Sequence, residues 1–190
     1  MFEHDAIHER GKALEDEFYH RVDEKLRKEL RESMEREKAR EQLASATGFR
    51  DKELLDHLID AGFQSSTLTA LALVPTVFVA WADGSVTDKE RQAVMSTAMQ
   101  RGLEHDPTAL QMVEAWLQKH PPRGLWKLWK EYAEAVHASV SPTLAEMLVK
   151  EILRQATIVA EASGGTLGFG KISKDEQAIL DEIQSMFPSE

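Results

Sequence analysis

Residues 3–44 combine a dense pattern of charges with apolar residues at every fourth position. The larger apolar residues of this series are Leu14, Phe18, Val22, Leu26, Leu30 and Met34. Each step of four advances the stripe by about 40° around a helix of about 3.6 residues per turn, so no heptad seam persists. We therefore predict a long helix over 3–44 that either lies obliquely across the body or projects from it. Two interpretations stay open: a solvated helix with a partial docking face, or a helix that binds a partner.

Beyond residue 47, helical patterns alternate with short, well-marked breaks. Several predicted helices begin at a capping residue, such as Asp51 or the Asp106–Pro107 and Ser141–Pro142 pairs, and several end at glycine. The predicted helices cover residues 52–61, 65–82, 87–101, 107–119, 124–139, 142–162 and 174–186. The sequence contains no convincing alternating strand pattern. We predict an all-α fold of eight helices, a compact helical bundle with a long charged N-terminal helix, divided into a helical extension at 1–46 and an all-helical domain at 47–190.

The most apolar stretch of the chain, Leu68–Trp81, is too short to cross a bilayer. A membrane-spanning helix needs roughly 20 apolar residues, so we expect this stretch to be a central, buried helix and expect no membrane span. Pro75 lies inside it and should bend it. The acidic N-terminus, Met1–Asp5, lacks the basic and apolar regions of a secretory signal, which favours a cytoplasmic protein.

The composition removes several classes of function. The 190 residues carry a formal net charge of −10, whereas a protein that binds a phosphate backbone usually presents a basic face. We therefore expect no nucleic-acid partner. The chain has no cysteine, which excludes disulfides, thiolate zinc sites and cysteine nucleophiles. Trp126 and Trp129 form an aromatic face at helical spacing that is either core or, if exposed, a partner surface.

A weak internal duplication is the most informative pattern in the chain. The segment Val79–Ala82 matches 159–162, and Gly84–Glu90 matches Gly170–Glu176. Each copy has an apolar helix, a glycine turn, a β-branched residue, a hydroxyl cap and a glutamate three residues after the cap, which is a capping box. The duplication predicts two related helix-turn-helix halves whose turns lie side by side.

The same turns suggest a site for a divalent cation. Asp83–Glu90 resembles the second half of a calcium loop, with oxygen ligands on a turn and a carboxylate on the following helix. Val79 and Trp81 occupy the upstream ligand positions, so an ion would need oxygens from the second copy. We predict Asp83, Glu90 and Glu176 as metal ligands for calcium, manganese or zinc. Simple helix capping is the alternative interpretation of the same residues.

These two turns carry a resemblance to a known family. Trp81–Val86 with Glu90, and Ala162–Ser173 with Glu176, are similar to the TerB-like tellurite-resistance proteins over about residues 60–188. The resemblance implies a compact bundle of two related halves, an acidic site for divalent cations at Asp83, Glu90 and Glu176, and a role in stress-response complexes with no defined reaction. Phe169 stands where the second copy would carry an aspartate.

The N-terminal extension resembles a different family. Arg10–Leu26 is faintly similar to the start of the zeta-type inhibitor of bacterial F-type ATP synthase. The leading hypothesis is a non-enzymatic cytoplasmic TerB-like protein in a stress-response or scaffold role. One alternative is a regulatory module that inhibits or tethers a protein partner through residues 3–44. The other is a metal-dependent hydrolase, which needs three or four converging ligands in a helical bundle.

Overall fold

The computed structural model describes the backbone of residues 2–162 and 172–187 and their side chains from Glu17 onward. In this part of the chain the fold is all-α, as the sequence predicts, with eight α-helices and two short 3₁₀ helices. The elements are α1 (Phe2–Thr47), α2 (Lys52–Asp60), η1 (Leu68–Leu73), α3 (Val74–Ala80), α4 (Asp88–Gln100), η2 (Leu103–His105), α5 (Pro107–Gln118), α6 (Arg123–Ser139), α7 (Pro142–Ala162) and α8 (Lys174–Ser185).

The capping residues read from the sequence begin the helices as expected. The Asp51 carboxylate accepts a hydrogen bond from the backbone N–H of Glu53 at 2.9 Å, and that of Asp106 accepts from Ala109 at 3.0 Å. Each satisfies a donor that has no partner within its own helix. At the end of α1, Gly48 has a φ of 76°, a left-handed conformation that costs glycine little.

The prediction of one apolar helix over residues 65–82 is wrong. The segment divides into the 3₁₀ helix η1 and the α-helix α3, and Pro75 lies at the start of α3. Proline has no N–H to donate and its ring obstructs the preceding turn, so an α-helix begins at such a residue more readily than it continues through it. The expected location in the core is confirmed, because Leu71, Val74 and Val77 are fully buried.

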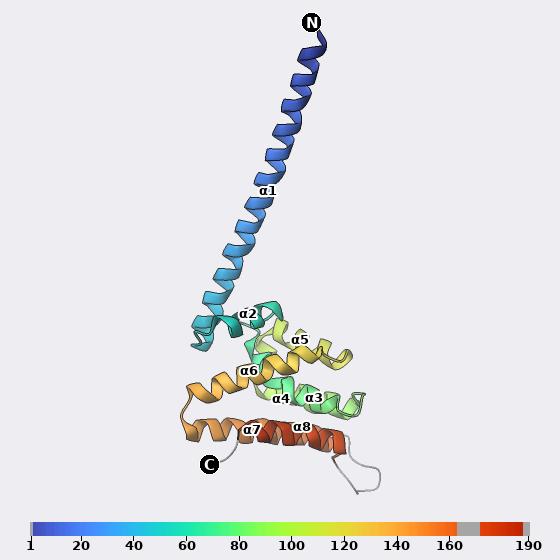
Figure 1. Cartoon of the computed structure of the whole chain (residues 1–190). Helices are drawn as coiled ribbons and strands as arrows, with labels where there is room; N and C mark the ends of the chain where they lie inside the picture. The colour runs from blue at the N-terminus through green and yellow to red at the C-terminus, as the bar shows by residue number, and fades with distance from the viewer. Residues whose placement is uncertain (1, 163–171, 188–190) are drawn as a thin grey trace.

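Helix α3 is the centre of the bundle. It contacts α4, α6, α7 and α8, and α7 packs against α4 and α8 as well. Figure 1 shows α7 and α8 side by side along one side of α3, with α5 and α6 toward the other. The first half of the internal repeat, α3 and α4, is therefore packed directly on the second half, α7 and α8.

Helix α1 differs from the others in that most of it extends away from the bundle (Figure 1). Its C-terminal turns pack on α2, where Leu43 is fully buried. The helix ends at Thr47, three residues beyond the predicted end at 44. Of the two predicted placements, the structure shows the projecting one, and the last turns of α1 form part of the body.

Candidate functional site

The two turns of the internal repeat form matching capping boxes. The backbone N–H of Thr87 donates to the Glu90 carboxylate at 2.7 Å, and the N–H of Glu90 donates to the Thr87 hydroxyl at 3.3 Å. The equivalent distances for Ser173 and Glu176 are 2.6 and 3.2 Å. Both glutamates are almost completely buried. Each carboxylate therefore has a structural role that needs no ligand.

The two capping boxes also lie close to each other. Burial raises the pKa of Glu90, and the negative charges of Asp83 and Glu176 raise it further. Such an effect between Glu90 and Glu176 requires proximity, and α3 and α7 both pack on α8. The carboxylates of the two copies are thus near enough for their charges to interact. Gly170, the turn glycine of the second copy, lies outside the described residues.

The geometry favours capping over ion binding at these carboxylates. Asp83 is exposed and accepts a hydrogen bond from the N–H of Ser85 at 3.0 Å, whereas Glu90 and Glu176 point into the bundle as caps. Among the side chains of residues 17–162 and 172–187, no three His, Asp or Glu residues are arranged to hold a metal ion. The cation site at Asp83, Glu90 and Glu176 stays a prediction, and so does the hydrolase alternative, which needs more ligands still.

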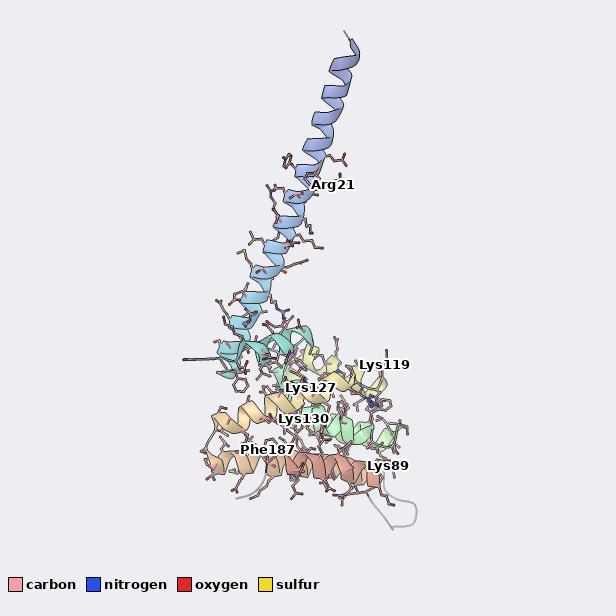
Figure 2. All side chains as sticks on the ribbon, viewed as in Figure 1. Arg21, Lys89, Lys119, Lys127, Lys130 and Phe187 are labelled. Carbon is pink, nitrogen blue, oxygen red and sulfur yellow. The ribbon has the colours of Figure 1, made fainter. Side chains whose placement is uncertain are left out.

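The projecting part of α1 presents a row of exposed apolar side chains. The row comprises Phe18, Val22, Leu26, Leu30 and Met34, with Tyr19 beside it. Leu26 has 57% of its surface exposed, and this part of the helix lies away from the bundle, as the label of Arg21 in Figure 2 shows. Exposed apolar residues that occur singly need no explanation, but an ordered row of them marks a contact surface.

Charged residues around this row are paired within α1. Arg27 and Asp23 are 2.9 Å apart, and Lys25 and Glu29 are 3.7 Å apart, both at i,i+4 spacing. Acidic and basic residues are equal in number between residues 17 and 47, although the whole chain carries −10. Such pairs stabilise the extended helix by roughly 0.2–0.5 kcal/mol each. The arm can therefore remain helical without packing on the body.

A cluster of ion pairs joins the arm to the bundle. Arg40 Nη2 lies 2.7 Å from Asp56 Oδ1, and Arg36 Nη1 lies 2.6 Å from Asp60 Oδ1. Arg36 Nε also contacts Asp56 at 3.1 Å. Hydrogen bonds and charge from these guanidinium groups lower the pKa of both aspartates. The joint sets the direction in which the exposed row of α1 leaves the body.

The aromatic residues of α6 belong largely to the core. Trp129 is buried, and the rings of Trp126 and Trp129 stack at a centroid distance of 4.8 Å. The indole N–H of Trp126 donates to the Glu182 carboxylate at 3.1 Å, which ties α6 to α8. Of the two interpretations of this face, core packing is confirmed.

Sequence reasoning missed an apolar cavity of about 480 Å³ that is lined mainly by α6 and α7. Arg101, which follows α4, lines one part of it and bonds to Gln155 on α7. These two residues are far apart in the chain, and neither belongs to a motif, so the sequence offered no signal for this site.

Comparison with known proteins identified no relative of this chain. No protein-family model, curated protein or solved structure matches the chain. The resemblance to TerB-like proteins and to the zeta-type inhibitor therefore depends on the short motifs alone. Among the helices described in the structure, none is long and apolar enough to span a membrane.

Proposed function

We propose that this protein is a non-enzymatic interaction protein whose N-terminal helix binds an apolar helical surface on another protein. The observation that carries this proposal is the exposed row of α1, Phe18, Val22, Leu26, Leu30 and Met34, on a segment that extends from the bundle. A cytoplasmic stress-response or scaffold assembly is the setting that the TerB-like motifs suggest, and it forms part of the proposal.

The spacing of the row defines the geometry of the partner. Side chains four residues apart form an inclined ridge, and two such ridges pack with their helices crossing at about −50°. A long coiled coil would instead need apolar residues with a mean spacing of about 3.5. The expected partner is therefore a helix of a folded protein that crosses α1 obliquely over Val22, Leu26 and Leu30.

Electrostatics supports an apolar mode of recognition. The charges beside the row are paired within α1, as between Asp23 and Arg27, and so do not present a field of one sign to a partner. Ion pairs of this exposed kind contribute roughly 0–1 kcal/mol, whereas burying one leucine contributes about 1.5–3 kcal/mol. The apolar row therefore supplies most of the binding free energy.

A capture experiment with matched variants tests the proposal. The double substitution Leu26→Gln with Leu30→Gln replaces the two central leucines of the row by a polar residue. Glutamine has a high helix propensity, so α1 should stay helical. Glu24→Ala with Lys28→Ala is the control, because these residues lie on the opposite side of α1. The tagged full-length wild-type protein and the control variant should both capture the specific partner. The leucine variant should fail to capture it. Equal recovery with both variants, at equal helix content, would contradict the proposal.

Weak binding of a divalent cation at Asp83, Glu90 and Glu176 is a second proposal. It is supported by the charges of Asp83 and Glu176, which add to the effect of burial in raising the pKa of Glu90. Calorimetric titration with calcium, manganese and zinc tests it. Wild type should give a binding heat that Asp83→Asn with Glu90→Gln abolishes, and the same response from both proteins would remove the cation from the account.

A further inference from the structure

The apolar cavity against α6 and α7 has the size and shape of a small-molecule site. Its volume is about 480 Å³, within the roughly 300–1,000 Å³ that such sites occupy. Trp129, Ala133 and Ala145 line it and are nearly inaccessible to solvent. Phe187, labelled in Figure 2, lines it too and stacks on His137 at a centroid distance of 5.1 Å. These lining residues lie below the protein surface. A slender molecule can therefore reach them more readily than the side of a helix can.

One part of the cavity carries a guanidinium group with a neutral partner. Arg101 donates from Nε and Nη2 to the side-chain oxygen of Gln155 at 2.9 and 2.7 Å. Gln155 is itself buried, with 5% of its surface exposed. Arginine has five N–H donors, so this arrangement uses only part of its capacity. Within the described residues, no carboxylate lies at ion-pair distance from Arg101.

The charges next to Arg101 leave an excess of positive charge. Gln155 donates to the Glu151 carboxylate at 2.6 Å, and Arg154 donates to the same carboxylate at 2.7 and 2.8 Å. Glu151, which also lines the cavity, is bonded to Arg154 outside the lining, and its charge acts on Arg101 as well. The two arginines and this carboxylate retain one net positive charge, and Arg101 is the cation that lines the cavity. An anionic group is therefore favoured here, even though the chain as a whole is acidic.

We propose that this cavity binds a single-chain aliphatic carboxylate, with its chain against Trp129, Ala133 and Ala145 and its carboxylate on Arg101. The planar guanidinium suits a carboxylate because it can donate two parallel hydrogen bonds. The apolar walls provide the hydrophobic contact that a hydrocarbon chain needs. This proposal is independent of the binding arm on α1.

Ligand titration with the full chain tests the site. Decanoate below its micelle concentration, or decanol below its solubility limit, is added while tryptophan fluorescence is recorded, because Trp129 lines the cavity. Calorimetry gives the stoichiometry. Decanoate should bind with one molecule per chain and about tenfold or more tighter than decanol, since a hydrogen bond to a charged group is among the stronger polar interactions.

Three variants test whether the carboxylate of decanoate binds at Arg101. Arg101→Gln should reduce the preference for decanoate over decanol to about twofold or less, while Arg101→Lys, which keeps a cation, should retain most of it. Lys150→Gln removes a positive charge of α7 that pairs with Glu146 outside the cavity, and it should leave the preference in place. Thermal melts confirm that each variant is folded.

Three results would overturn the proposal. One is an equal affinity of wild type for decanoate and decanol, which would show that no anion is recognised. Another is an undiminished preference for decanoate in folded Arg101→Gln, which would place the binding site elsewhere. Absence of saturable binding by either compound would equally exclude a ligand site in this cavity.

Discussion

The projecting arm and the bundle both carry leucines four residues apart on a helix, but with opposite results. Leu26 on α1 has 57% of its surface exposed, whereas Leu58 on α2 is fully buried. The difference lies in the neighbours: α2 packs against α1 and α6, while the described structure places no helix over the row around Leu26. An apolar stripe shows that a helix has a contact face, and the rest of the fold determines whether that contact is internal.

Truncating one leucine in each region gives the largest contrast. Leu58→Ala should lower the free energy of unfolding by about 2–5 kcal/mol, because it leaves a cavity in the core. Leu26→Ala should change it by no more than about 0.5 kcal/mol. Urea denaturation at low protein concentration measures both values. A loss of more than about 1 kcal/mol for Leu26→Ala would show that the arm is packed in solution.

The two capping boxes of the bundle provide the next largest effect. Thr87→Ala and Ser173→Ala should each lower the free energy of unfolding by about 0.5–2 kcal/mol, because a backbone donor at the start of α4 or α8 loses its partner. The same denaturation assay applies. Ser33→Ala, in the middle of α1, is the control and should have little effect. Equal losses of unfolding free energy in all three variants would show that the two capping hydroxyls contribute no more than the hydroxyl of Ser33.

The bundle should also lose stability in acid. Hydrogen bonds from Arg154 lower the pKa of Glu151 to about 2, and Lys130 lowers that of Glu182. These carboxylates bind protons more weakly in the folded state than in the unfolded chain, where the reference pKa is 4.5. Their contribution is therefore complete above about pH 4.5 and is lost as the pH falls toward about 2.

Urea midpoints at pH 6, 4 and 3 measure this loss. Wild type should show a falling midpoint below pH 4.5, and Arg154→Gln should show a smaller acid-dependent change because Glu151 then titrates closer to its ordinary value. Identical pH profiles for the two proteins would remove this ion pair from the account.

The joint between arm and bundle should give the smallest effect on overall stability. Asp56→Asn removes the charge that Arg36 and Arg40 share, so the last turns of α1 should open more often. Hydrogen exchange should become faster in residues 36–47 and stay unchanged in the core helices α3 and α7. Exchange that accelerates equally throughout the chain would mean that the joint stabilises the whole fold.

The sequence predicted elements whose signals are local. Capping at Asp51, Thr87, Asp106 and Ser173 follows from neighbouring residues, and all four caps are present in the structure. Pro75 shows the limit, because apolar periodicity alone could not distinguish a bent helix from the observed change between η1 and α3. The repeat predicted that Glu90 and Glu176 lie near each other, since related halves pack together.

The remaining features depend on distant parts of the chain. The contact between Arg101 and Gln155 joins positions on different helices, and no spacing rule connects them. The direction of α1 depends on ion pairs with α2 that the alternating charges of the arm do not specify. The choice between helix capping and ion binding at the acidic turns depends on carboxylate orientation, which residue types do not encode.

Site-specific photo-crosslinking tests the central claim, that the apolar row of α1 is a binding surface, most directly. A photoreactive amino acid is placed at Leu26, within the row, or at Glu24, on the opposite side of the helix. Irradiation in cells should give a discrete adduct from position 26 and little or none from position 24, and its mass distinguishes another protein from a second copy of the chain. Equal adducts from both positions, or none from either, would contradict the account.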